Sequence, residues 1–254
     1  MASDVSAKTL FLVTDVTHMH EGRVCILGVD DKFKTIRPDL PDRIHEGQLV
    51  LPTGVIRPRA VFEMYFNPLE KLIPPHIEDM AWDINQENKF LRMADENKWH
   101  NALEKTSFPS VKDIFGAMIH HSRSIVYKQG KRSVGTIKMK SLIYFRYASN
   151  DNYGREGYRI GFTDESDANY PEMMITDLTF RYYFHNLLKT MTIKEAVQSV
   201  ENYLSKTDCY LRIGLTREWS NHHWLQVNGI YTFPDYAKGM CFMDYKQAGI
   251  TLPD

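Results

Sequence analysis

The sequence predicts a mainly β protein with α insertions, an α+β chain in which two small β units are joined by helices. Two blocks of the chain consist of short runs rich in β-branched and aromatic residues, separated by Gly, Pro and Asp. Between them, the chain is more charged and its apolar residues fall at helical spacing. We therefore expect a barrel over 1–82, a helical linker over 83–122, a second barrel over 123–235 and a tail over 236–254.

The first unit is expected to contain five strands, at 10–14, 24–29, 33–38, 48–51 and 60–66. So many short strands in one stretch are typical of a small barrel. Asp30 and Asp31 lie between two of these runs, and this position predicts a tight hairpin there.

The linker is expected to be mostly helical over 84–122. Ser110 is a plausible N-cap, and Asp113 stands three residues later, which is the spacing of a capping box. Apolar residues follow at helical spacing, namely Val111, Ile114, Phe115, Met118 and Ile119.

The second unit is expected to contain strands at 134–147, 157–163, 173–182, 211–216 and 224–231. One helix interrupts them at 192–205. Thr192 and Glu195 have capping-box spacing, and the apolar residues that follow share one helical face.

The overall composition limits the classes of function. The 254 residues include 31 Lys and Arg against 32 Asp and Glu, so no whole-chain charge favours nucleic acid and any such site must be local. Three widely spaced cysteines argue against a disulfide framework, and no apolar run reaches the ~18 residues that span a bilayer. We expect a cytoplasmic protein that does not bind membranes.

Positive charge is concentrated in one segment, residues 114–150, which contains seven Lys and Arg and no Asp or Glu. Strand alternation predicts a buried face and a polar face in its second half. The buried face would hold Ile137, Met139, Ile143 and Phe145, and the polar face Lys138, Lys140, Tyr144 and Arg146.

The polar face fits a surface that binds single-stranded nucleic acid. Cations there would neutralise phosphates, while the Tyr144 ring would stack on a base at about 1–3 kcal/mol. The alternative is an ordinary solvated strand face, because lysines also protect edge strands from aggregation.

The histidines do not predict a metal site. The ten histidines lack the spacing of metalloprotease or zinc-deaminase motifs, and we expect no bound metal. His76 does stand beside Glu78 and Asp79, which together supply groups for acid–base chemistry. The alternative is a loop whose carboxylates cap the next helix. Nucleotide-binding glycine motifs are also missing from the sequence, so we expect no cofactor.

The last informative stretch predicts two antiparallel strands, at 211–217 and 224–234. They carry Arg217, His223, Trp224 and Gln226 as polar and aromatic groups. Trp224 fits either a core position or a stacking surface.

Several segments together resemble the bacterial dual OB-domain proteins. They are TLFLVTD (9–15), HEGRVCILGV (20–29), IRP (36–38), PPHIED (74–79), RIGLTR (212–217) and WLQVNGIYTFP (224–234). The resemblance implies two OB-like barrels, and members of that family are described as nucleic-acid-binding or nucleic-acid-modifying proteins, often in prokaryotic conflict or defence systems. The motif positions fall on Arg23, Arg37, His76, Glu78, Asp79, Arg217 and Gln226.

The sequence thus favours a protein that binds single-stranded DNA or RNA, or structured RNA, over one with catalytic activity. The binding residues would be Arg23, Arg37, Lys131, Arg132, Lys138, Lys140, Tyr144, Arg146, Arg159, Arg217 and Gln226. Two alternatives stay open. One is an enzyme that modifies or cleaves nucleic acid with His76, Glu78 and Asp79, and the other is an adaptor that binds a protein partner in a larger complex.

Overall fold

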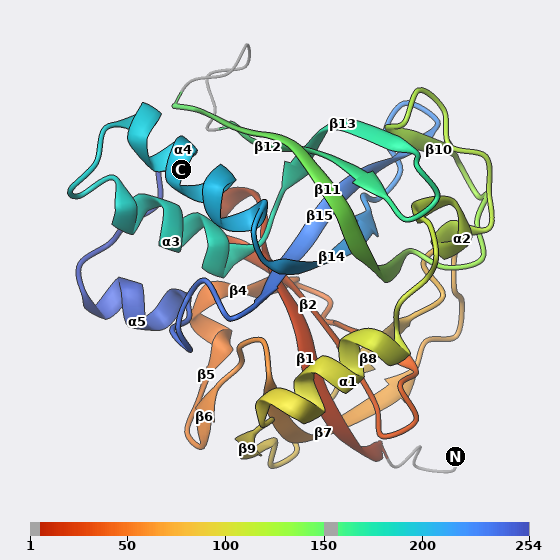
Figure 1. Ribbon diagram of the computed structural model, residues 1–254. Helices are drawn as coiled ribbons and strands as arrows, with labels where there is room; N and C mark the ends of the chain where they lie inside the picture. Colours follow the sequence, from red (N-terminus) through yellow and green to blue (C-terminus); the bar gives the residue numbers. More distant parts are fainter. Residues whose placement is uncertain (1–5, 150–156, 254) are drawn as a thin grey trace.

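Two closed five-stranded β-barrels lie against each other in the computed structural model, which describes residues 6–149 and 157–253 (Figure 1). In each barrel the strands pair in the same order. Numbered within the barrel, strand 1 pairs with 2, 2 with 3, 3 with 5, 5 with 4, and 4 again with 1. Strands 3 and 5 run parallel and the other neighbours run antiparallel. This arrangement is consistent with two OB-like barrels.

The first barrel consists of β1 (Ala7–His18), β2 (Arg23–Val29), β3 (Thr35–Asp39), β7 (Ala60–Pro68) and β8 (Asp79–Trp82). Shorter elements extend it: η1 (His20–Gly22), β4 (Ile44–His45), η2 (Glu46–Leu49), β5 (Val50–Leu51), β6 (Gly54–Val55) and β9 (Lys89–Met93). The four predicted runs at 10–14, 24–29, 33–38 and 60–66 form barrel strands. The fifth run, 48–51, is strand only at Val50–Leu51, where β5 pairs with β6 outside the barrel, and β8 completes the barrel instead.

The connection between β2 and β3 is longer than the predicted tight hairpin. Residues 30–34 form the loop, and Phe33 takes a left-handed backbone conformation with φ 61°. The Asp30 carboxylate accepts hydrogen bonds from the backbone N–H groups of Lys32 and Lys34. Asp30 therefore closes a loop of five residues. The favoured two-residue hairpin turns prefer glycine, and neither Asp30 nor Asp31 is glycine.

The linker between the barrels contains less helix than predicted. It includes α1 (Glu96–Lys105) and α2 (Val111–Phe115), but also β9, which pairs with β7 of the first barrel. Ser110 caps α2 as predicted, since its side chain accepts from the backbone N–H of Asp113. The helix ends at Gly116, whose φ of 58° stops it before Met118 and Ile119.

The second barrel consists of β11 (Val134–Ala148), β12 (Gly157–Asp164), β13 (Asn169–Ile175), β14 (Asp208–Leu215) and β15 (His222–Phe233). The short strand β10 (Ser124–Val126) pairs with the start of β15. Between β13 and β14 lie α3 (Leu178–Leu187) and α4 (Ile193–Leu204), and α4 has the predicted capping box of Thr192 and Glu195.

The predicted strand at 173–182 is wrong beyond Ile175. Asp177 caps α3, and its carboxylate accepts from the backbone N–H groups of Phe180 and Ile230. The cap starts a helix in a run of aromatic residues whose composition favours strand.

Helix α3 contributes to both barrels. Phe180 and Phe184 pack into the core of the second barrel, while Leu178 and Tyr182 pack into that of the first. The tail also returns to the first barrel, because α5 (Phe242–Gln247) buries Phe242 and Tyr245 in its core. Within the described residues, no helix is long and apolar enough to cross a bilayer.

Candidate functional site

Several of the motif positions meet at the seam between the two barrels. Asp79 of β8 lies across from Arg37 of β3 in the parallel pairing, and Arg217 reaches the same carboxylate from the second barrel. The Nη2 atom of Arg37 lies 2.5 Å from Oδ1 of Asp79, and that of Arg217 lies 2.8 Å from Oδ2. Two cations share one anion, so this group of three carries a net charge of +1.

Two histidines lie beside this group and share one acceptor. The carbonyl oxygen of Thr216 lies 3.1 Å from Nε2 of His76 and 3.0 Å from Nδ1 of His223. Because a carbonyl oxygen only accepts, both rings carry a proton on the nitrogen that faces it. Burial, together with the charges of Arg37 and Arg217, lowers the pKa of His76 to about 2. His76 is therefore neutral near pH 7 and poorly suited to donate or accept a proton in catalysis.

The carboxylate of Glu78 has a different partner. It accepts from the backbone N–H of Ser133 at 2.8 Å and from the Ser133 hydroxyl at 2.9 Å, so it joins the two barrels. The three residues considered for acid–base chemistry thus bond to three different groups and do not converge on one reacting centre. The helix-capping alternative is also wrong, because strand β8 begins directly at Asp79.

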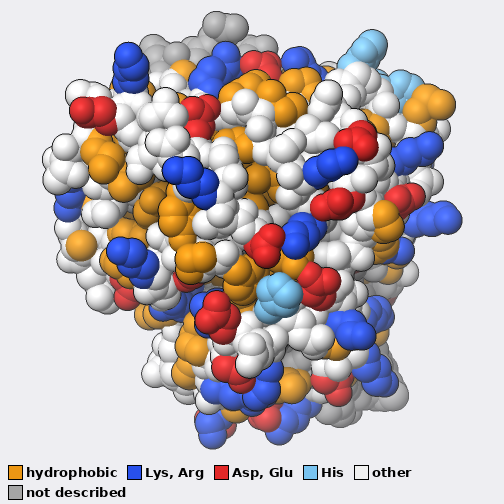
Figure 2. Space-filling model, in the orientation of Figure 1, with side chains coloured by type: hydrophobic (Ala, Val, Ile, Leu, Met, Phe, Trp, Pro, Cys, Tyr) orange, Lys and Arg blue, Asp and Glu red, His pale blue; other side chains and the backbone are white. Residues whose placement is uncertain are grey.

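The basic segment is neutralised in space, contrary to the expectation from the sequence. Ion pairs link Lys138 to Asp208 at 3.1 Å, Lys140 to Asp167 at 2.6 Å and Arg146 to Glu172 at 2.9 Å. Figure 2 shows Lys and Arg side chains intermingled with Asp and Glu on the visible face. The seven positive charges that are contiguous in sequence do not form a continuous unpaired ribbon.

Strand β11 also departs from strict alternation. Ile137, Met139 and Phe145 are buried as predicted, but Ile143 is 47% exposed. The pairing with β12 shifts register twice, on either side of residues 141 and 142. Such bulges turn a side chain to the opposite face. Tyr144 is half-buried over Gly161, and burial and the nearby Glu172 carboxylate raise its pKa.

The remaining predicted binding residues are spread over the molecule. The Arg132 guanidinium stacks on the Phe108 ring at 4.4 Å, and the stem of Lys131 lies over Gly116. Arg23 pairs with Glu21 next to it, and Gln226 donates to the side chain of Asn228. Arg159 lies opposite Arg146 in the pairing of β11 with β12.

A row of aromatic side chains occupies the loop from β14 to β15 and the strands beside it. Trp219 is 65% exposed, and its ring centroid lies 5.9 Å from that of Trp224. The Trp224 ring lies 6.0 Å from His222, which in turn lies 6.0 Å from His120. We call these four residues the aromatic row. Trp224 is half-buried, so it belongs to this surface and not to the barrel core.

Sequence reasoning missed Trp219, although its position gave a signal. It follows Arg217 in a short polar loop just before His222, where a large apolar side chain has little core to join. Histidine side chains gather near β10 at the upper right of Figure 2, at the edge of the molecule where the aromatic row lies.

The described residues contain no group of three or more His, Cys, Asp or Glu side chains arranged to hold a metal ion. No family model, curated protein or solved structure matches the chain. Function therefore has to be argued from the two barrels and from the surfaces described above.

Proposed function

We propose that the protein binds single-stranded nucleic acid on the aromatic row of its second OB-like barrel. The observation that carries the proposal is the position of the row, in the connection between the fourth and fifth strands of the barrel and on the fifth strand itself. OB-fold proteins bind strands across one face, between the loop after strand 1 and the loop after strand 4.

The exposure of Trp219 supports stacking. Neighbouring rings of the row lie 5.9 to 6.0 Å apart and are tilted by 44° to 83°, so they pack against one another and a base would stack on the outward face of a single ring. Each base that stacks in this way contributes about 1–3 kcal/mol regardless of its identity. A surface of this kind favours flexible single strands whose bases are not already stacked in a duplex.

Cations flank the row and supply phosphate contacts. The Arg217 side chain is 45% exposed, and it shares its carboxylate partner with Arg37. Arg123 precedes β10, and its carbonyl accepts from the backbone N–H of Leu225, next to Trp224. The Arg123 side chain is 52% exposed and lies 3.3 Å from Glu172, a carboxylate that also pairs with Arg146, so a phosphate would compete for this arginine. Phosphates bound by Arg217 and Arg123 would make the affinity for nucleic acid fall as the salt concentration rises.

The resemblance to the bacterial dual OB-domain proteins supports the same function, since that family is described as binding or modifying nucleic acid. We infer a cytoplasmic location because Cys25, Cys209 and Cys241 are all free thiols, as is usual in a reducing compartment.

The test measures affinity for a fluorescently labelled oligothymidine by anisotropy. Replacing both tryptophans, Trp219→Ala with Trp224→Ala, should weaken binding at least about tenfold, because two stacking partners are lost. The matched control is Lys138→Gln with Lys140→Gln, which removes two charges that already pair with Asp208 and Asp167 and adds no negative charge, and it should bind within about threefold of the wild type.

Two results would overturn the proposal. One is the absence of binding by the wild type, and the other is a loss in the lysine variant as large as that in the tryptophan variant. The second result would move the site to the outer face of β11.

A further inference from the structure

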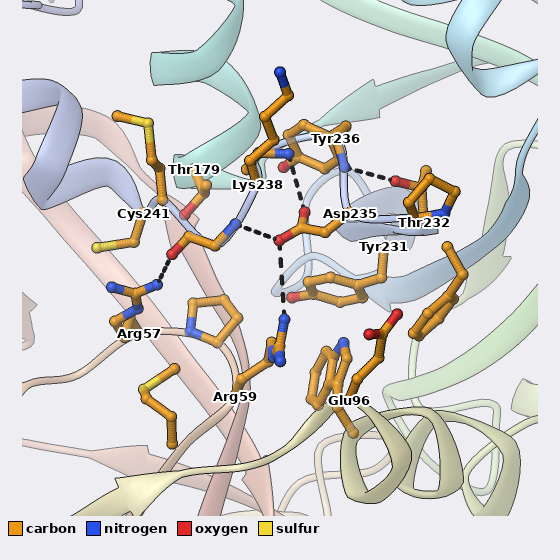
Figure 3. Close-up of a pocket in the computed structure, with 18 residues that line it drawn as sticks. Arg57, Arg59, Glu96, Thr179, Tyr231, Thr232, Asp235, Tyr236, Lys238 and Cys241 are labelled. Carbon is orange, nitrogen blue, oxygen red and sulfur yellow. Dashed lines mark hydrogen bonds and ion pairs between the residues drawn. The ribbon is translucent and has the colours of Figure 1, made fainter.

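A cavity of about 560 Å³ lies far from the aromatic row, between the first barrel, α1 and the end of β15 (Figure 3). Its walls include Arg57, Arg59, Trp99, Thr179, Tyr231 and Asp235. Strand β15 runs from the row to the cavity, and the eight residue-to-residue steps from Trp224 to Thr232 span roughly 26 Å at about 3.3 Å each. The cavity is therefore a separate site, of a size typical for small ligands.

Unpartnered hydrogen-bond donors surround this cavity. In the described part of the chain, six buried side-chain nitrogen or oxygen atoms have no hydrogen-bond partner, and three of them belong to its wall. They are Nε of Arg57, Nε of Arg59 and Oγ1 of Thr179. Thr179 is only 7% exposed. A buried donor without an acceptor costs about 1–3 kcal/mol, so a ligand with acceptor oxygens would stabilise this wall.

Two of the acidic side chains nearby fix the backbone, and a third, Glu96, lines the cavity beside Tyr231. Asp235 accepts from the backbone N–H groups of Ala237 and Gly239, and it lies 3.9 Å from Arg59. Asp244 accepts from the backbone N–H of Cys241 and lies 3.4 Å from Arg57. Both ion pairs are long. Nη2 of Arg57 also donates to the carbonyl oxygen of Gly239, and Nη2 of Arg59 to that of Ala94, so Nε is the atom that each guanidinium keeps for a further acceptor.

Helix α3 contributes the unpartnered hydroxyl. Thr179 is the second residue of this ten-residue helix, so its side chain stands at the N-terminal end. Asp177 already caps the backbone N–H of Phe180 there, so the Thr179 hydroxyl is the donor that remains for a ligand. In Figure 3, Thr179 lies on the same side of the cavity as Arg57, while Arg59 points towards Asp235 from below.

The opposite wall is aromatic. The Trp99 and Tyr231 rings meet edge to face with centroids 4.8 Å apart, and Phe233 also lines the cavity. A flat heterocyclic ring would bury apolar surface against this wall. The cavity thus combines donors for an anionic group at one side with a surface for a ring at the other.

We propose that this cavity binds a nucleoside phosphate. The phosphoryl oxygens accept hydrogen bonds from Arg57, Arg59 and Thr179, and the base lies against Tyr231 and Phe233, which are partly buried, whereas Trp99 is only 3% exposed. This site goes beyond the proposed nucleic-acid surface and does not depend on it.

The experiment measures binding of AMP, adenosine and inorganic phosphate to the full chain by titration calorimetry. AMP should bind at least about tenfold more tightly than adenosine or phosphate alone. Arg59→Met and Thr179→Val should each weaken AMP binding at least about fivefold, and Lys206→Met, which changes an exposed residue outside the cavity lining, should leave it within about twofold.

The row variant Trp219→Ala with Trp224→Ala should bind AMP like the wild type, and Arg59→Met should still bind oligothymidine. These two controls separate failure of the cavity proposal from failure of the nucleic-acid proposal and show that the variant is folded. No AMP binding at about 1 mM, equal affinity for adenosine and AMP, equal affinity for phosphate and AMP, or AMP binding that depends on the row would overturn the inference.

Discussion

Arg212 of β14 and Asp15 of β1 form an ion pair across the seam between the barrels, with Nε 3.0 Å from Oδ2 and neither side chain exposed. The two other nitrogen atoms of the Arg212 guanidinium also have partners, since Nη1 donates to the Thr136 hydroxyl and Nη2 to the Thr14 hydroxyl. The pair is therefore fully hydrogen-bonded and inaccessible to water.

Breaking this pair on one side should strongly destabilise the protein. Arg212→Met leaves the Asp15 carboxylate buried without its cation, and we expect a loss of about 3–5 kcal/mol in the free energy of unfolding, measured by urea denaturation. The double variant Arg212→Met with Asp15→Leu removes both charges and should recover much of that loss. If the double variant is as unstable as the single one, the unpaired charge is not the cause.

The His76 side chain should make stability depend on pH. Its pKa is 6.5 in the unfolded chain and about 2 in the fold, so the unfolded chain binds more protons between these values. The free energy of unfolding should therefore fall as pH drops below about 6.5, by at most about 1.4 kcal/mol per pH unit, and this contribution should be constant above it.

The matched variant is His76→Gln, which keeps a donor for the Thr216 carbonyl and does not titrate. Burial raises the pKa of Asp177 to about 7, which acts in the opposite direction between pH 3.8 and 7 and is common to both proteins. The wild type minus variant difference in unfolding free energy isolates His76. A difference that does not change between pH 7 and pH 5 would contradict the prediction.

Gly28 should not tolerate a side chain. A methyl group there would lie 2.5 Å from the carbonyl oxygen of Leu12 and against the Phe11 ring. Because the backbone of β1 has to move, we expect Gly28→Ala to cost about 1–3 kcal/mol. Gly47→Ala is the control, since nothing lies within 4 Å of the added atom, and its thermal midpoint should match the wild type. Equal midpoints for both variants would refute the prediction.

Phe242 of α5 should be needed for the first barrel. It is fully buried in that core, and Phe242→Ala should cost about 3–5 kcal/mol in chemical denaturation. Met240→Ala changes an exposed residue two positions away and should stay within about 0.5 kcal/mol of the wild type. A mild effect of Phe242→Ala would mean that the tail only covers the surface.

The strands with clear alternation were predictable from the sequence, and elements set by distant partners were not. β8 has only four residues and becomes a strand by pairing with β3 and β7, which no local pattern shows. The first half of α3, up to Tyr182, was predicted as strand because its aromatic residues favour β structure, although Asp177 was available as a helix cap.

The candidate site was likewise predictable only where local sequence determines it. Arg37, Asp79 and Arg217 were singled out individually, but their meeting depends on how the two barrels pack. The partners of Lys138 and Lys140 lie 70 and 27 residues further along the chain, so the neutralised charge of β11 was invisible in the local sequence. The cavity at Arg57 and Arg59 is likewise formed by segments far apart in sequence.

The return of the tail to the first barrel affects how the protein is made. Residues 241–250 fill the core of a barrel whose strands leave the ribosome much earlier, so that barrel must wait for almost the whole chain before it is complete. During synthesis its apolar interior stays partly uncovered. The two halves are therefore expected to mature together after translation and not one after the other.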